Sequence, residues 1–315
     1  MLKQNSGNHL RIIELATAQE DGTRYLSLRG TERGRRLEEI YGSGFDGVQQ
    51  DALISAESKD GLYRVYGVAD GMGGSDTRGA SLVAANILKA VYEGSVEGIP
   101  SFREDKFKLG QRMLYRSVWN RMNLEAARVK KDAGFDLGNI GATFGVVTQR
   151  GEDAYITHAG NVRVYTVLDD GSIQLRTLDH SRTQTLLSDG IITDEQACVH
   201  DKKHTVASAV MLSWGPDPAG ITVQKLDLTG VDRVIVGSDG IIDELMTCPF
   251  NHSRRYDAIL ALTKVLSETS SAQETCEALR DAALMFGKNR EEEQGKTNKI
   301  DNMSVIVAKM THPKS

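Results

Sequence analysis

Hydrophobic and polar positions follow two different periods along this chain. Residues 63–69 are largely apolar, as expected for a half-buried or buried strand, and they lead directly into Asp70 and a run of glycines at 71, 73 and 74. From 80 to 91, and again from 107 to 134, apolar residues recur every three or four positions, which predicts two helices. The central part of the sequence therefore predicts a strand, a sharp glycine-rich turn and two helices.

From Gly141 the period becomes two. Short turns at 150–151, 160–161 and 169–171 separate the strands that this period predicts, so we expect antiparallel hairpins arranged as a meander. A polar run at 288–299 is predicted to be a mobile loop. The predicted strands are 12–18, 52–55, 143–148, 154–158, 162–168, 173–178, 222–228, 233–237 and 303–310, and two further helices are predicted at 253–267 and 272–286.

The domain organisation follows from what the sequence lacks. No internal repeat and no convincing linker interrupts it, so we predict one domain over 45–315. Residues 1–44 are charged and glycine-rich after the first predicted strand. They are interpreted as an N-terminal arm, or as a first strand plus an insertion.

Three aspartates lie beside predicted strand ends. Asp70 and Asp239 are each followed by glycine after a buried strand, and Asp301 immediately precedes a strand. Carboxylates that meet at one edge of a sheet repel one another unless a cation lies between them, and Mg2+ or Mn2+ prefers such oxygen ligands. The pattern indicates a divalent-cation site, and three unrelated turns are the alternative.

Composition narrows the choice of function. The formal charge of −5 over 315 residues gives no basic surface for nucleic acid. Cys198, Cys248 and Cys276 lack CxxC spacing and are odd in number, so neither a disulfide framework nor a zinc knuckle is indicated, and a reducing compartment fits. Neither a signal peptide nor a membrane-spanning run is recognised, so we expect a cytoplasmic protein that does not bind membranes.

Seven short motifs occur in the order and roughly the spacing of one family. The chain resembles the metal-dependent serine/threonine protein phosphatases (PPM, type 2C), most closely their bacterial branch, over about residues 45–310. The motifs are DGMGG at 70–74, GATF at 141–144, HAGNVRVY at 158–165, LDHS at 178–181, GIITDEQA at 190–197, SDGIID at 238–243 and DNMSVIV at 301–307.

The resemblance implies an α+β fold, a four-layer αββα sandwich of two antiparallel sheets flanked by helix pairs. It also implies a site for two Mg2+ or Mn2+ ions. Asp70 would bridge them, the Gly71 carbonyl would bind the second, and Asp239 and Asp301 would complete the first. In addition, Asp51 would orient metal-bound water, and Asn302 would support Asp301 from behind.

The reaction implied is hydrolysis of phosphoserine and phosphothreonine in proteins by a metal-bridging hydroxide, without a covalent intermediate. Asp51, Asp70, Asp239 and Asp301 are the predicted catalytic residues. The implied partners are a phosphorylated protein substrate and an opposing serine/threonine kinase.

Three positions depart from the family pattern. Asp46 stands where the family commonly has a phosphate-binding arginine, which should weaken substrate binding. Asn161 replaces the aspartate that resembles a third-metal ligand, so occupancy there should be weaker. Met72 replaces a histidine of eukaryotic relatives and cannot transfer protons, although bacterial members resemble this chain there.

Two alternatives stay open. A pseudophosphatase would keep the sandwich as a regulatory or binding module, and Asp46 and Asn161 motivate that hypothesis. The second alternative is a phosphatase that acts on small molecules. Residues 181–215, which correspond to a flap segment, would determine that choice of substrate. His180, within the LDHS motif, is predicted to make structural hydrogen bonds and not to act in catalysis.

Overall fold

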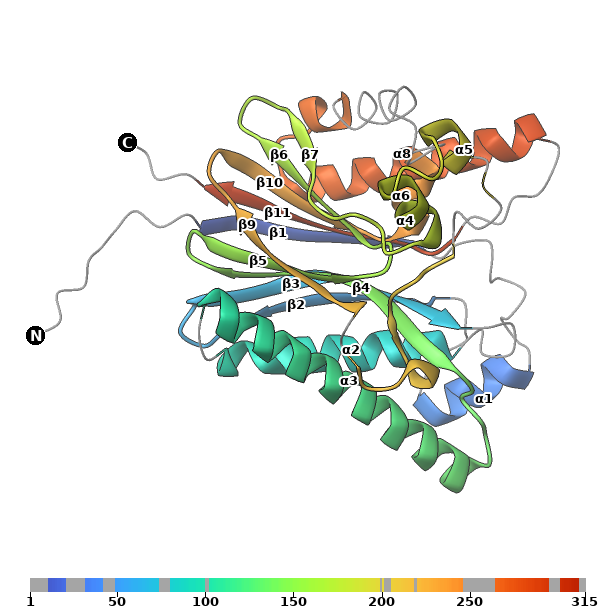
Figure 1. The fold of residues 1–315 in the computed structure, drawn as a ribbon. Coiled ribbons are helices and arrows are strands. Elements are labelled where there is room, and N and C mark those ends of the chain that lie inside the picture. The colour runs from blue at the N-terminus through green and yellow to red at the C-terminus, as the bar shows by residue number, and fades with distance from the viewer. Residues whose placement is uncertain are drawn as a thin grey trace, which may run out of the picture.

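Two antiparallel sheets lie face to face with helices on both outer sides (Figure 1). This arrangement confirms the predicted four-layer α+β sandwich. The computed structural model describes residues 11–20, 32–41, 49–73, 80–99, 102–198, 200, 205–217, 220–245, 264–294 and 301–311.

Sheet A contains five strands in the order β1-β11-β10-β6-β7. Its strands are β1 (Arg11–Glu20), β11 (Met303–Thr311), β10 (Val231–Gly237), β6 (Arg163–Leu168) and β7 (Ile173–Leu175). Arg11 of β1 pairs with Thr311 of β11, so segments from opposite ends of the described chain are neighbours in this sheet.

Sheet B has the order β2-β3-β4-β5-β9, and β8 pairs with β4 beside this path. Its strands are β2 (Asp51–Glu57), β3 (Tyr63–Gly73), β4 (Ile140–Arg150), β5 (Asp153–Ala159), β9 (Thr222–Asp227) and β8 (Val210–Met211).

Helices cover the outer face of each sheet (Figure 1). On sheet B lie α2 (Ser81–Ser95) and α3 (Glu104–Ala133), with α1 (Glu32–Tyr41) packed against them through the buried Leu37. On sheet A lie α6 (Asp239–Leu245) and α8 (Ala272–Gln294). Two short helices, α4 (Arg182–Ser188) and α5 (Asp194–Cys198), belong to the segment between β7 and β8.

The hydrophobic core forms three layers. Tyr66 and Val236 belong to the layer between the two sheets. Leu88 and Met122 fill the layer between sheet B and its helices, and Leu279 belongs to the corresponding layer beneath α8. All five side chains are at most 1% exposed. Close packing on both faces keeps the strands of each sheet in register, so the residues at strand ends are held in fixed positions.

The 30-residue helix α3 begins and ends as its charges predict. Glu104 and Asp105 lie in its first turn and Lys130 and Lys131 in its last, which complements the helix dipole at both ends. Gly134, with φ of +61°, adopts the left-handed conformation that ends the helix.

The predicted meander is wrong at one turn. The β4–β5 and β6–β7 turns are hairpins, but β5 belongs to sheet B and β6 to sheet A, so the chain crosses between sheets at Gly160. Gly160 has φ of +96°, and a Cβ there would lie 2.2 Å from Cγ2 of Thr143. A glycine is therefore required at this crossing.

The C-terminal helix is longer than predicted. Because α8 continues to Gln294, the mobile loop predicted for 288–299 is wrong over 288–294, and its remaining residues 295–300 lie outside the described ranges. The helix predicted at 253–267 lies largely outside them too, although 264–268 are helical. Among the described residues, no helix has the length and apolar character to cross a bilayer.

Candidate functional site

Two of the predicted site residues are direct neighbours on adjacent strands of sheet B. Asp51, the first residue of β2, pairs with Asp70 of β3. The Gly71 N–H donates a hydrogen bond to the carbonyl oxygen of Gln50 at 3.0 Å, which extends this contact. The expectation that the strand ends at Asp70 is wrong, because β3 continues to Gly73 and stays paired with β4 as far as Ile140. Asp70 therefore lies inside a sheet and has a rigid backbone.

The other two predicted carboxylates come from sheet A. Asp239 begins α6 directly after β10, and Asp301 stands two residues before β11. The side chain of Asp301 accepts a hydrogen bond from the Asn302 N–H at 3.0 Å. A Cβ on Gly240 would lie 1.9 Å from the Asn302 carbonyl oxygen, so only glycine lets α6 pack this close to the 301–302 segment.

Asn302 joins the two sheets. Its Oδ1 accepts a hydrogen bond from the Gln50 N–H at 3.2 Å, immediately before Asp51. Gln19 of β1 makes a second link, because its Nε2 donates to the Asp51 carbonyl oxygen at 3.1 Å and to Ser304 Oγ at 3.0 Å. No sequence pattern pointed to Gln19. The backbone on both sides of the carboxylate cluster is thus fixed by hydrogen bonds across the sandwich.

The four carboxylates interact electrostatically. Burial, followed by repulsion from Asp301 and Asp239, raises the pKa of Asp51 to about 8, although hydrogen bonds with Ser304 and Ser238 oppose the shift. The pKa of Asp70 is raised well above its usual range by burial and then by Asp51 and Asp301. Burial, Asp70 and Asp301 also raise the pKa of Asp239. The structure therefore brings all four predicted carboxylates into one cluster.

The chemistry of this cluster suits a divalent cation. Oδ2 of Asp51 and Oδ1 of Asn161 are buried oxygens without a hydrogen-bond partner, and the carboxylates repel one another. A hard cation relieves both conditions. Within the described ranges, however, no three Asp, Glu, His or Cys side chains stand in the arrangement of a finished metal site. The cluster supplies suitable donor atoms without a completed coordination geometry.

Residues from the GNVR motif complete the surroundings of Asp239. Asn161 Nδ2 donates to Asp239 Oδ2 at 2.7 Å. Arg163 is buried and forms ion pairs with Asp179 and Asp243, an arrangement that the sequence did not predict for these residues. The pKa of Arg163 is raised well above its usual value, because attraction to the two aspartates outweighs the opposing effect of burial.

The LDHS motif holds the turn at Gly160. The His180 N–H donates to the Gly160 carbonyl oxygen at 2.8 Å, and its ring Nε2 lies 2.9 Å from Thr222 Oγ1. The ring also packs against His158, with 4.3 Å between ring centroids. These contacts agree with the structural hydrogen bonds predicted for His180, and its role stays a prediction. Met72 lies within β3 opposite Gly141, whereas Asp46 and Gly74 lie outside the described residues.

A pH-dependent stability follows from the raised pKa of Asp51. Its folded-state pKa of about 8 exceeds the ordinary value of about 4, so between these pH values the folded protein binds more protons than the unfolded chain. The cation-free protein should therefore lose stability as pH rises from about 4 to 8. Thermal unfolding in EDTA across this range measures the effect.

One variant and one added cation test whether the carboxylate cluster causes this pH dependence of stability. Asp51→Asn should reduce the slope of the profile, because an amide does not titrate, while Asp70 and Asp239 continue to contribute. Saturating Mg2+ should raise the unfolding temperature more at pH 8 than at pH 5, since the cation binds the deprotonated carboxylates. A stability that is independent of pH, with no response to Mg2+, would contradict the electrostatic description of the cluster.

Comparison with known proteins gives sequence similarity over part of the chain. No family model matches the sequence. The serine/threonine protein phosphatase PstP of Mycobacterium tuberculosis is 26% identical over 194 residues, which are 61% of this chain and 35% of the relative. The matched region thus spans about a third of that curated relative.

Solved structures match nearly the whole chain. A bacterial serine phosphatase superposes with a TM-score of 0.68 at 16% identity, covering 97% of this chain and 100% of that protein. The catalytic domain of PstP, in complex with two manganese ions, has a TM-score of 0.59 at 20% identity and covers 96% and 99% of the two chains. At these identities the structural matches show a shared fold.

Proposed function

We propose that this chain, which belongs with the bacterial type 2C (PPM) phosphatases by sequence similarity and fold, hydrolyses phosphoserine and phosphothreonine in proteins with Mg2+ or Mn2+ as cofactor. One observation carries the proposal. Four aspartates from distant segments of the chain form a single cluster in which burial, and then mutual repulsion, raises three of their pKa values. Such a cluster is costly to the fold unless it binds cations.

Each residue has a proposed role. Asp70, Asp239, Asp301 and the Gly71 carbonyl would hold two cations, by analogy with the two manganese ions in the related PstP structure. When bound, divalent cations lower the pKa of water and neutralise charge on a phosphoryl group. Asn302 keeps Asp301 in place through its backbone N–H. A third cation next to Asn161 would be bound weakly, because an amide carries no charge.

Asp51 is suited to handle a water molecule. Its Oδ2 is buried without a hydrogen-bond partner, while Ser304 and Ser238 hydrogen-bond to the same carboxylate. The free oxygen can accept a hydrogen bond from a water molecule and so orient it toward a phosphorus atom. We therefore assign Asp51 to orienting the attacking water, consistent with its place beside Asp70.

The proposed substrate is a phosphorylated protein, which implies an opposing serine/threonine kinase and fits a cytoplasmic location. In Figure 1 the segment that carries α4 and α5 is drawn at the same end of the sandwich as α6. We propose that this segment, residues 181–215, contributes to the choice of substrate.

Hydrolysis of p-nitrophenyl phosphate tests the proposal. We expect activity with Mn2+ or Mg2+, complete loss in EDTA and recovery on adding back Mn2+, because the cations supply the positive charge that the aspartate cluster lacks. A phosphoserine peptide should be hydrolysed under the same conditions. Full activity in EDTA would contradict the proposal. Cation binding without hydrolysis of either substrate would instead support the binding module on the same fold.

A further inference from the structure

The segment 161–163, which leads into β6, contacts α6 at two residues one helical turn apart. Asn161 Nδ2 donates to Asp239 Oδ2 at 2.7 Å, and Arg163 Nη1 donates to Asp243 Oδ1 at 3.3 Å. Both donors come from one short segment that follows the crossing between the sheets, and both acceptors come from one face of a single helix. The two contacts are therefore parallel links between the same two elements.

The two contacts can form together. Asn161 and Arg163 are two residues apart at the entry to β6, and residues four apart in a helix are separated by about 6 Å along its axis and share a face. Asn161 and Arg163 can therefore reach Asp239 and Asp243 at the same time. The packing of α6 against α8 and the 301–302 segment places the helix, and the two contacts further constrain the rotation that sets the direction of the Asp239 carboxylate.

Arg163 is itself held rigidly. Its Nε and Nη2 donate to the two carboxylate oxygens of Asp179 at 2.8 and 2.5 Å, a bidentate pair with fixed geometry. The side chain of Arg163 is 4% exposed and that of Asp179 is 9% exposed. The guanidinium that contacts α6 is thus anchored from the opposite side by a residue of the 178–181 motif.

The first contact depends on the amide at position 161. An amide N–H can donate to the Asp239 carboxylate, whereas an ionised carboxylate at the same place would repel it. The departure from the family pattern therefore has a structural consequence in this chain, because it allows Asn161 to take part in holding the helix.

We propose that Asn161 and Arg163 form a two-point clamp on α6, as positioning residues that fix the orientation of the Asp239 carboxylate. The inference rests on the proposed function, since it treats Asp239 as a cation ligand. Hydrogen-bonding partners of ligating carboxylates typically change metal affinity by about 10- to 100-fold when they are removed. Weakening the clamp should therefore be visible in cation binding itself.

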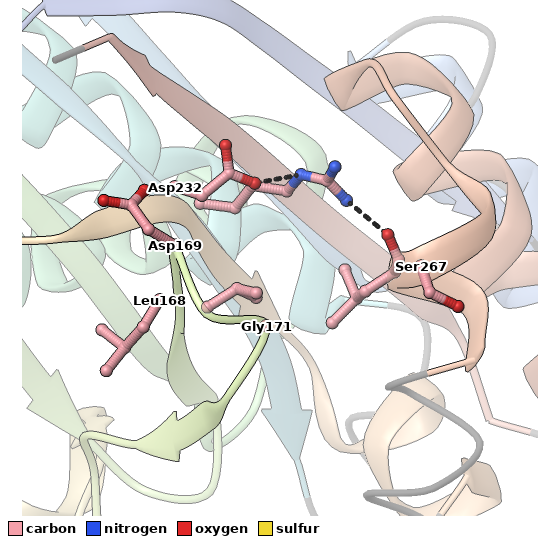
Figure 2. A pocket seen from close by; sticks show the side chains of 8 residues that line it. Leu168, Asp169, Gly171, Asp232 and Ser267 are labelled. Atoms are coloured by element: carbon pink, nitrogen blue, oxygen red, sulfur yellow. Dashed lines mark hydrogen bonds and ion pairs between the residues drawn. The ribbon is translucent and has the colours of Figure 1, made fainter.

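A matched control lies at the opposite end of sheet A. Arg233 of β10 is 6% exposed, pairs with Asp232 at 3.0 Å and donates to the carbonyl oxygens of Leu266 at 3.4 Å and Thr269 at 2.7 Å. Together with Asp169 and Ser267 it lines a cavity of about 340 Å³ (Figure 2), whose lining includes no residue of the aspartate cluster. Arg233→Lys thus disturbs an equally buried arginine in the same sheet without touching α6.

The experiment compares Arg163→Lys with Arg233→Lys. Lysine keeps the charge and loses the planar fork, so both variants should unfold at a lower temperature than the wild type. Calorimetric titration with Mn2+ should show a loss of affinity of about 10- to 100-fold for Arg163→Lys and unchanged affinity for Arg233→Lys. With p-nitrophenyl phosphate and saturating Mn2+, Arg163→Lys should lower kcat more than it raises KM.

Asn161→Ala provides a second variant if Arg163→Lys does not fold. It removes the amide donor without changing the net charge, and its affinity for Mn2+ should also fall. Wild-type Mn2+ affinity in both Asn161→Ala and a folded Arg163→Lys would overturn the clamp. An equal loss of affinity in Arg163→Lys and Arg233→Lys would also overturn it, since the effect would then reflect general destabilisation.

The wild-type titration separates the two proposals. Mn2+ binding and hydrolysis by the wild type, together with unaffected clamp variants, would leave the proposed function standing and reject the clamp. A wild-type protein that binds no Mn2+ would reject the proposed function, and the clamp with it.

Discussion

Asp239→Asn is expected to reduce phosphatase activity by more than about 100-fold at any Mn2+ concentration, since loss of a ligand should exceed the 10- to 100-fold effect of outer partners. The substitution keeps the shape of the side chain and removes one negative charge from a cluster that includes Asp70 and Asp301. Hydrolysis of p-nitrophenyl phosphate, measured together with calorimetric Mn2+ titration, checks both consequences.

The same substitution should stabilise the protein in EDTA. Besides burial and Asp301, the charge of Asp239 raises the pKa of Asp51, so removing that charge relieves one of the repulsions within the cluster. A higher unfolding temperature with lower activity is the signature of a site that trades stability for function. Asp232→Asn, in the same sheet but at its far end, is the control and should leave activity unchanged. Wild-type activity in Asp239→Asn would contradict the proposed role.

Arg163→Met is expected to lower the free energy of unfolding by about 3–5 kcal/mol, the range found when one partner of a buried ion pair is removed. Methionine is comparable in length, but it leaves the carboxylates of Asp179 and Asp243 without their cation in a buried setting. Small domains are stable by about 5–15 kcal/mol, so the variant would lose a large part of its total stability. Urea unfolding monitored by circular dichroism measures the change.

Two further variants test the cause of that loss. Arg112→Met removes an exposed arginine of α3 and should change the free energy of unfolding by less than about 0.5 kcal/mol. Adding Asp179→Asn to Arg163→Met should restore part of the stability, because the dominant penalty is a buried charge without a partner. Asp179→Asn alone is measured for comparison. If it lowered the free energy of unfolding by the same amount in the wild type and in Arg163→Met, the two residues would act independently, and this explanation would be wrong.

Much of the fold follows from local pattern. Alternating apolar residues placed the strands of both sheets, and the helical period placed α2 and α3, because burial of one face is a local property of each segment. The β5–β6 connection was mispredicted as a hairpin, since a two-residue turn with glycine has the same sequence whether the next strand joins the same sheet or the facing one. Only the close approach of Gly160 to Thr143 distinguishes the two outcomes.

Some residues of the candidate site could be predicted from the sequence and others could not. Asp70, Asp239 and Asp301 could be grouped from the sequence because each lies near a strand and carries the expected chemistry. The ion-pair network of Arg163 with Asp179 and Asp243 could not be predicted from the sequence. Its members are far apart in the chain and meet only in the folded structure, and a single Arg or Asp in a sequence is most often a surface residue. Asp70 also lies within β3 instead of at its end, because β4 is long enough to continue the ladder to Gly73.

The pairing of β1 with β11 has a consequence for synthesis of the protein. During translation β1 emerges well before β11, which is its neighbour in sheet A among the described strands and which follows Asp301 by two residues. At about 5–20 residues per second, β1 waits for many seconds beside the ribosome before that neighbour exists. Sheet B, whose strands all precede residue 228, can assemble in the meantime. The nascent chain therefore completes its aspartate cluster only after the described strands of sheet B have been synthesised and Asp301 has emerged.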